Sequence, residues 1–135
     1  MPYVHHVSVT PKPAAPAAIS GPTHICLPQN GVMYSVPVID FADTYNWSVP
    51  SGAMIVSGNG TNSITVDFAA NASSGIIRVF ASNECGNGAS SPNLNITVAA
   101  IPPTPTITYH GDTLTSSATS GNQWYKDGIA ISGAI

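Results

Sequence analysis

The run from Gly75 to Gly86 constrains the fold more than any other stretch of this chain. Successive side chains of a β-strand point to opposite faces. One parity of this run carries the charged Arg78 and Glu84. The other parity is apolar and ends on a cysteine: Ile77, Val79, Ala81 and Cys85. We therefore expect a β-strand with one face in a core and the other towards water.

The chain has only one other cysteine, Cys26, near the start of the same domain. A core-facing strand that ends on a cysteine predicts a two-sheet sandwich joined by a Cys26–Cys85 disulfide. Closing a loop of about 60 residues would stabilise the fold by roughly 4 kcal/mol in the chain-entropy treatment. Such a bond would also indicate an oxidising, extracytoplasmic compartment. Two buried free thiols are the alternative.

Composition agrees with an all-β domain that has many turns. Charged residues make up 7% of the chain and hydrophobic residues 43%, with 12 Gly and 12 Pro. Disorder normally requires low hydrophobicity, whereas here Val and Ile occur in short alternating runs, as is typical of strands. No helical period is present. We expect about seven strands, at residues 19–26, 31–38, 45–49, 53–57, 63–68, 75–85 and 92–98.

Charge and hydropathy argue against nucleic-acid binding and against a membrane-spanning segment. Only Lys12, Arg78 and Lys126 are fixed cations, and the net charge is −3. Three scattered cations cannot form the basic patch that nucleic-acid binding needs. No run approaches the ~18 apolar residues of a membrane span. The N-terminus lacks the pattern of a signal peptide, so we interpret the chain as part of a longer protein.

An internal repeat organises the chain. Residues 96–107 resemble residues 7–19 at an offset near 88, and both runs read as last strand, proline-rich linker and first strand of the next domain. The expected domains are the last strand of a preceding module (1–10), a stiff Pro/Ala linker (11–18), one whole sandwich (19–98), a Pro-rich linker (99–105) and the front of an incomplete second module (106–135).

Several motifs, in order, resemble a known family. They are Ile-Ser-Gly-Pro-Thr from Ile19, Cys26, Tyr-Asn-Trp-Ser-Val-Pro-Ser-Gly from Tyr45, Gly-Asn-Gly-Thr-Asn-Ser-Ile-Thr-Val from Gly58 and Ala-Ser-Asn-Glu-Cys-Gly from Ala81. This set is similar to the PKD-like (polycystic-kidney-disease-like) domains of secreted and surface proteins of Bacteroidota. The resemblance covers residues 19–98. The stretch 104–128 is similar to the Ig-like repeats that often follow such domains.

The resemblance implies an Ig-like or PKD-like antiparallel β-sandwich in a multidomain protein at the cell surface or outside the cell. Such proteins commonly use the type IX secretion route and act in adhesion, gliding or polysaccharide degradation. The expected function is that of a non-catalytic spacer or adhesion stalk, and its expected partners are neighbouring modules of the same protein.

No catalytic set is present, since the sequence has neither a Gly-x-Ser-x-Gly elbow nor a His-Glu-x-x-His helix motif. No cofactor is expected. Calcium is the one metal we consider, because Asp40, Asp43 and Asp67 fall at loops or outward strand positions. Calcium takes six or more oxygen ligands. Solvated carboxylates are therefore the favoured interpretation of these three residues.

The aromatic pair Tyr45 and Trp47 has the parity of the core, and a Trp beside the bridging disulfide is the familiar arrangement of Ig-like sandwiches. Exposure of both would instead favour a sugar-stacking platform. Trp124 and Tyr125 occupy the equivalent strand of the second module. Two further functions stay open: a carbohydrate-binding accessory module of a secreted polysaccharide-degrading enzyme, and a fibre subunit. In the fibre, the strand expected at residues 3–9 would complete a neighbour's sheet head to tail.

Overall fold

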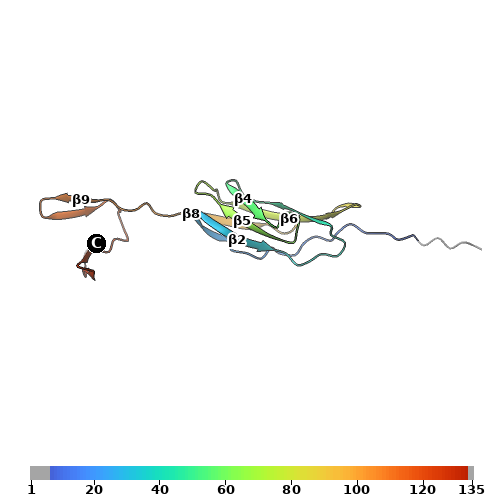
Figure 1. Cartoon of the computed structure of the whole chain (residues 1–135), viewed down its shortest axis with the longest axis horizontal. Coiled ribbons are helices and arrows are strands. Elements are labelled where there is room, and N and C mark those ends of the chain that lie inside the picture. Colours follow the sequence, from blue (N-terminus) through green and yellow to red (C-terminus); the bar gives the residue numbers. More distant parts are fainter. Residues whose placement is uncertain (1–6, 134–135) are drawn as a thin grey trace, which may run out of the picture. The chain divides into compact units, whose positions relative to one another are not determined.

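The computed structural model describes residues 7–133 of the chain. They belong to two compact units, Met1–Ile101 and Pro102–Ile135. All regular elements of the described residues are β-strands or isolated bridges (Figure 1). The structure therefore confirms the all-β fold class.

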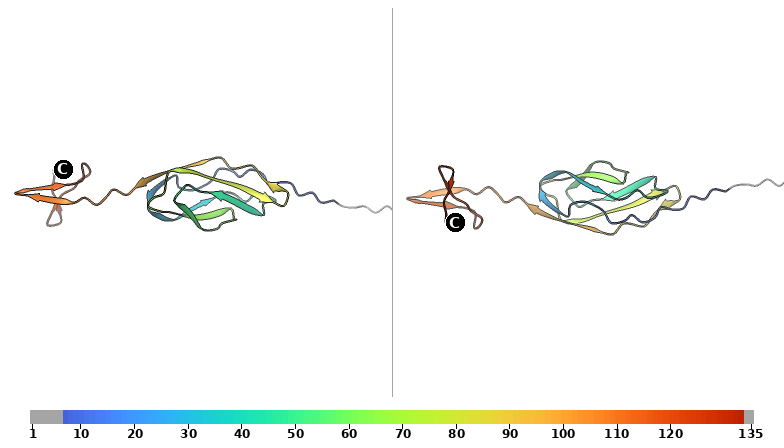
Figure 2. Two further views of the ribbon diagram at one scale, coloured as in Figure 1. Left: turned by 90° about the horizontal axis from the view of Figure 1, so that it is seen from above. Right: turned by 90° about the horizontal axis from the view of Figure 1, so that it is seen from below.

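The first unit is a sandwich of two sheets, which Figure 2 shows from two further sides. One sheet has the order β1-β8-β6-β3 with β7 paired to β6, and the other has the order β2-β5-β4. The strands are β1 (His24–Leu27), β2 (Gln29–Ser35), β3 (Thr44–Ser48), β4 (Ala53–Ser57), β5 (Ser63–Phe68), β6 (Gly75–Asn83), β7 (Gly86–Asn87) and β8 (Leu94–Ala100).

The core lies between the two sheets and follows the alternation of the sequence. On β5, Ile64, Val66 and Phe68 are at most 1% exposed, while the residues between them are partly exposed. Tyr34 of β2 packs edge-to-face on Phe68, with ring centroids 6.5 Å apart. Aromatic pairs in this arrangement add to the stabilisation from area burial alone.

A tight turn at Pro50–Gly52 joins the strands expected at residues 45–49 and 53–57. Ala53 N donates to Pro50 O at 3.1 Å, and Gly52 has φ +77°. A Cβ on Gly52 would lie 2.6 Å from Ala72 Cα. Only glycine meets both the backbone conformation and the close contact at this position.

The first predicted strand, 19–26, is divided between the two sheets. Ser20 bridges Ser35 next to one sheet, and β1 pairs in parallel with β8 in the other. The Tyr34 ring lies directly against Gly21, and its hydroxyl donates to Pro22 O at 3.0 Å. Because a proline has no N–H to donate, the crossing between sheets falls where a sheet ladder is interrupted anyway.

The chain enters and leaves this sandwich at opposite ends. Gly75 of β6 pairs with Ile96 of β8, whereas Asn83 lies at the far end of β6 beside β7. Ala100, the last residue of β8, pairs with Leu27 beyond the Gly75 end. We call the end near Asn83 the upstream pole and the end near Ala100 the downstream pole.

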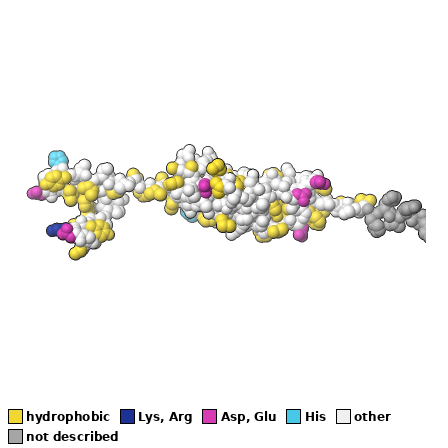
Figure 3. All heavy atoms as spheres, viewed as in Figure 1, with side chains coloured by type: hydrophobic (Ala, Val, Ile, Leu, Met, Phe, Trp, Pro, Cys, Tyr) yellow, Lys and Arg dark blue, Asp and Glu magenta, His cyan; other side chains and the backbone are white. Residues whose placement is uncertain are grey.

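The second unit is built differently. It contains two separate antiparallel ribbons, one of β9 (Ile107–His110) with β10 (Thr113–Ser116) and one of β11 (Tyr125–Lys126) with β12 (Ile129–Ala130). Among residues 102–133, none is buried. Hydrophobic side chains lie on its surface in Figure 3. These strands fall where the sequence places the front of a second module, but they do not enclose a core.

The strand expected at residues 3–9 lies partly outside the described residues. Residues 1–6 are not described, and Val7–Val9 form no strand. Val7 and Val9 are 83% and 81% exposed.

Candidate functional site

Asn83 is the centre of a cluster at the upstream pole that holds the incoming chain. Its Nδ2 donates to Pro11 O at 2.7 Å and to Phe41 O at 2.9 Å, while its Oδ1 accepts from Cys85 N at 2.9 Å. One side chain therefore joins the incoming segment, the β2–β3 loop and the β6–β7 turn. We call Asn83, Cys85 and the carbonyls they bind the upstream clamp.

Cys85 contributes the second tie of the upstream clamp. Its Sγ donates to Thr10 O at 3.0 Å. Thr10 and Pro11 are consecutive, so two neighbouring carbonyls are fixed to the sandwich by two side chains. The chain has no free length between Thr10 and the surface of the upstream pole.

Residues after the clamp continue as an extended strap along the sandwich. Pro13, Pro16 and Ile19 are buried, and the two residues between each pair are exposed. A polyproline II helix has three residues per turn, which places every third side chain on one face. The Pro/Ala segment is thus packed on the sandwich, and Gly88 lies so close to Pro13 O that any side chain there would clash.

Phe41, in the β2–β3 loop, has a left-handed backbone with φ 61° and is 57% exposed. A bulky residue in this region of φ/ψ space is an outlier. Two hydrogen bonds hold the loop in this conformation: Asn83 Nδ2 binds the Phe41 carbonyl, and Ala42 N donates to Ile39 O at 3.3 Å. The loop is therefore fixed by the same asparagine that holds the strap.

The residues predicted for the core lie there. Ile77 and Val79 of β6 are 0% exposed, and Tyr45 of β3 is 7% exposed. The Tyr45 hydroxyl accepts a hydrogen bond from Ile39 N at 2.8 Å. Trp47 packs partly buried against the core, and its Nε1 donates to Thr61 O at 2.8 Å. Tyr45 is therefore a core residue, and Trp47 lies at the margin of the core.

The three aspartates considered for calcium are not brought together. Asp40 and Asp43 lie in the β2–β3 loop at the upstream pole. Asp67 is the next-to-last residue of β5, at the end of that strand away from the β2–β3 loop. Its Oδ1 accepts a hydrogen bond from Gly31 N at 2.7 Å. Within residues 7–133 there is no group of three or more His, Cys, Asp or Glu side chains that could hold a metal ion. These three side chains therefore do not converge on one site.

The expected disulfide is also corrected by the structure. Cys26 and Cys85 are both free and exposed. Cys26 lies on β1 beside Ala99 near the downstream pole, and Cys85 lies in the turn beyond Asn83 at the upstream pole. The nine residues of β6 between these poles span roughly 30 Å at the rise of a strand. A disulfide needs Cα atoms within about 7 Å.

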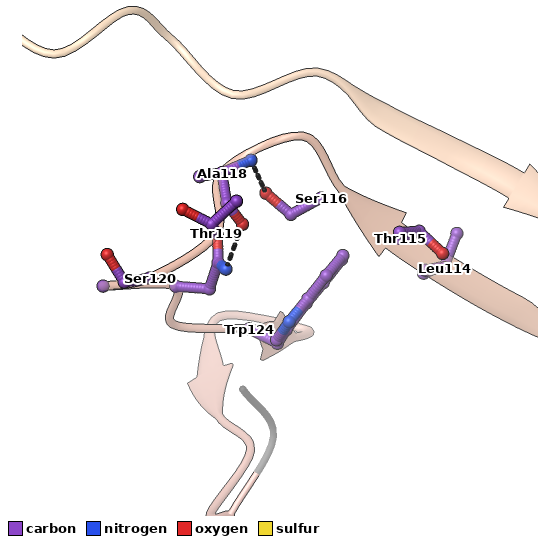
Figure 4. A pocket seen from close by; sticks show the side chains of 9 residues that line it. Leu114, Thr115, Ser116, Ala118, Thr119, Ser120 and Trp124 are labelled. Carbon is purple, nitrogen blue, oxygen red and sulfur yellow. Dashed lines mark hydrogen bonds between the residues drawn. The ribbon is translucent and has the colours of Figure 1, made fainter.

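A cavity of about 440 Å³ in the second unit is lined by Trp124, Leu114 and several small polar residues (Figure 4). Asn122 Nδ2 donates to Ala118 O at 2.9 Å, and Ala118 N donates to Ser116 Oγ at 3.1 Å, which shapes the wall of this cavity. Trp124 is only partly buried.

Sequence reasoning missed Asn83 and the docking of the strap. The spacing of Pro13, Pro16 and Ile19 carried a signal, because a three-residue apolar period is typical of a polyproline II segment with one buried face. The residue that holds this segment is far away in sequence: Asn83, which donates to Pro11 O, follows Pro11 by 72 positions. Nothing local to either segment indicates the contact.

These features define a class of protein: an Ig-like β-sandwich module through which the chain passes from pole to pole. A sequence profile of the PKD-like domain matches residues 12–96, and the chain belongs to this family. The matched region begins at Lys12 and so includes the strap. No curated protein matches the chain.

Membership has general consequences for function. PKD-like domains are typically extracellular and generally non-catalytic. Among the described residues, no helix is long and apolar enough to cross a membrane.

Proposed function

We propose that this chain is part of a spacer or adhesion stalk, in which PKD-like modules hold other domains of an extracellular protein at a distance from a surface. The observation that carries the proposal is the position of the two chain ends of the first unit. The chain is clamped at the upstream pole through Thr10 and Pro11, and it leaves through Ala100 at the downstream pole. Modules connected in this way extend end to end.

The pairing of the terminal strands supports a mechanical role. β1 and β8 are parallel neighbours over four residue pairs, from His24↔Thr97 to Leu27↔Ala100. Tension applied through the two poles pulls β1 towards the upstream pole and β8 towards the downstream pole. All hydrogen bonds between the two strands are then loaded together in shear, instead of breaking one after another.

The fixed strap supports the same role. Each ordered backbone residue costs roughly 1–2 kcal/mol of conformational entropy, so a segment that is already ordered adds little compliance to a stalk. Burial of Pro13 and Pro16 removes the slack that a free Pro/Ala linker would give. Secretion by the type IX route and a bacterial surface location belong to this proposal.

Small-angle X-ray scattering on a duplicated chain tests the proposal. The repeat of 89 residues, from Val7 to Ile96, allows residues 1–98 to be joined directly to residues 10–135. We expect the maximum dimension to exceed that of the single chain by about 30 Å or more, the length of the central strand. Two modules folded back on each other, with little increase in maximum dimension, would contradict the spacer function.

Carbohydrate binding is the second candidate function, and the Trp124 cavity favours it. A partly exposed indole can stack on the apolar face of a sugar, and hydroxyl and amide groups such as those of Ser116 and Asn122 bind sugar hydroxyls. Titration with soluble oligosaccharides, read by Trp fluorescence in the wild type and in Trp124→Ala, tests it. Identical responses of the two proteins would exclude Trp124 as a binding residue.

A further inference from the structure

The strands of the β1-β8-β6-β3 sheet, β7 included, carry one fixed charge, Arg78 in the middle of β6. Ile77 and Val79 on either side of it point into the core, so Arg78 points to solvent, where it is exposed. No Asp or Glu occurs on any strand of this sheet. The positive charge of its outer face is therefore not neutralised by a carboxylate of the same strands.

A neutral amide fixes the direction of the Arg78 side chain. Arg78 Nε donates to Asn93 Oδ1 at 2.6 Å, and Asn93 directly precedes β8, the strand beside β6. A guanidinium has five N–H donors in one plane, four of them on the two Nη atoms. Asn93 is the one protein partner of this side chain within residues 7–133, so the edge formed by the two Nη atoms is available to a ligand. That edge matches the two oxygens of a carboxylate.

Polar and aromatic side chains surround Arg78 on the same face. Phe80 is partly exposed and lies two residues further along β6, roughly 7 Å from Arg78 along the strand. Ser48 is the strand partner of Arg78, and Asn46 is that of Phe80; directly opposed residues of an antiparallel pair share a face. Asn46 Nδ2 donates to Ser82 Oγ at 3.0 Å, which leaves the Asn46 amide oxygen as an acceptor for a ligand.

We propose that this face, formed by Arg78, Phe80, Ser48 and Asn46, binds an acidic polysaccharide. The Nη edge of Arg78 holds the carboxylate of one uronic acid residue, and the Phe80 ring packs on the C–H face of a neighbouring sugar. The amide and hydroxyl groups bind sugar hydroxyls. A single cation does not provide the basic patch that a nucleic acid needs.

This site goes beyond the spacer function, because it is a surface of one module and does not depend on how modules are joined. It also differs from the cavity of the second unit, whose lining includes no cationic side chain.

Titration with two forms of one polymer tests the role of the carboxylate. Polygalacturonate has a carboxylate on each sugar, and its fully methyl-esterified form has the same backbone without the charge. We expect the chain to bind the acid at least about tenfold more tightly than the ester in calorimetry at low salt, because charge-assisted hydrogen bonds are the stronger ones. Equal affinity for the two polymers would overturn the inference, and this comparison needs no substitution.

Variants at Arg78 identify the group that meets the carboxylate. Arg78→Gln should weaken binding of polygalacturonate about tenfold and leave binding of the ester unchanged, so that the variant no longer distinguishes the two polymers. Arg78→Lys keeps the charge but lacks the planar pair of donors, and its affinity should lie between those of Arg78→Gln and the wild type. Lys126→Gln is the matched control for net charge and should bind as the wild type does. An equal loss in Lys126→Gln and Arg78→Gln would overturn the site.

Phe80→Leu keeps an apolar side chain but removes the ring, and it should weaken binding of acid and ester alike by about two- to tenfold. Urea midpoints of all variants confirm that they are folded. Dextran sulfate distinguishes the anion: binding that is tighter than that of polygalacturonate and is lost in Arg78→Gln would assign a sulfate and overturn the uronate. The scattering measurement on the duplicated chain is independent, since an extended chain that does not bind polygalacturonate refutes the polysaccharide site alone.

Discussion

The two units of this chain contain similar strands but differ in what those strands cover. In the first unit, β2, β5 and β6 press Tyr34, Phe68 and Ile77 between two sheets, where they are fully buried. In the second unit, Ile107 and Leu114 lie on a two-stranded ribbon and are 62% and 54% exposed. Isolated two-stranded ribbons are marginal in water because they have no second layer. A strand pattern therefore gives little stability until a facing sheet covers its apolar side.

The largest loss of stability is expected for a core residue of the first unit, with an apolar strand residue of the second unit as its control. Phe68→Ala should lower the free energy of unfolding by about 3–5 kcal/mol, because it removes a fully buried ring and leaves a cavity. Leu114→Ala should change it by less than about 0.5 kcal/mol, since the side chain is exposed. Urea unfolding followed by circular dichroism measures both. Equal losses would mean that the second unit shares the cooperative core.

The second prediction compares two asparagines that each bind a carbonyl. Asn83→Ala should cost about 1–3 kcal/mol, because it leaves the Pro11 and Phe41 carbonyls and the Cys85 N–H without this partner. Asn122→Ala removes one bond to Ala118 O in the second unit and should not change global stability. The same urea assay applies. Limited proteolysis after Lys12 should accelerate only in the Asn83 variant.

The third prediction concerns alkaline pH. Burial raises the pKa of Tyr34 from 10.0 to about 12, so between these values the unfolded chain loses this proton and the folded chain keeps it. Stability is unaffected by Tyr34 below pH 10 and falls as pH rises towards 12. We expect a loss of about 1–2 kcal/mol over this range, after allowance for solvent screening.

Tyr34→Phe isolates this effect. The variant lacks the hydroxyl that donates to Pro22 O and should be less stable at neutral pH. The difference between wild type and variant should shrink as pH rises from 10 to 12. A difference that is independent of pH would show that Tyr34 ionises equally in both states.

The smallest change in stability is expected when the two tryptophans are substituted. Trp47→Phe removes the hydrogen bond from Nε1 to Thr61 O and should cost about 1 kcal/mol beyond the change in packing. Trp124→Phe in the second unit should leave the urea midpoint unchanged. A measurable shift for Trp124→Phe would indicate that the cavity it lines is part of a folded core.

Much of the first unit could be predicted because its signals are local. Alternation along β5 and β6 identified the buried faces, since the side-chain period of a strand is independent of the rest of the fold. Ile77 and Val79 are confirmed as core residues on this ground. The turn at Pro50–Gly52 depends on the conformational limits of its own residues.

The inward position expected for Cys85 was wrong because side-chain alternation holds only within a strand. The parity of β6 was extended to Cys85, but the strand ends at Asn83 and the hairpin turn to β7 resets the direction of the side chains. Cys26 occupies an outward position on β1, between the buried Ile25 and Leu27. The upstream clamp joins segments 72 residues apart, and no rule based on neighbours in sequence reaches that far.

The native cysteines allow the separation of the two poles to be measured directly. Spin labels attached to Cys26 and Cys85 report their distance by pulsed dipolar spectroscopy without any substitution. Because the nine residues of β6 lie between the two sites, we predict a distance of roughly 30 Å or more. A distance below about 15 Å, or resistance of both thiols to labelling without reductant, would contradict the opposite placement of the chain ends.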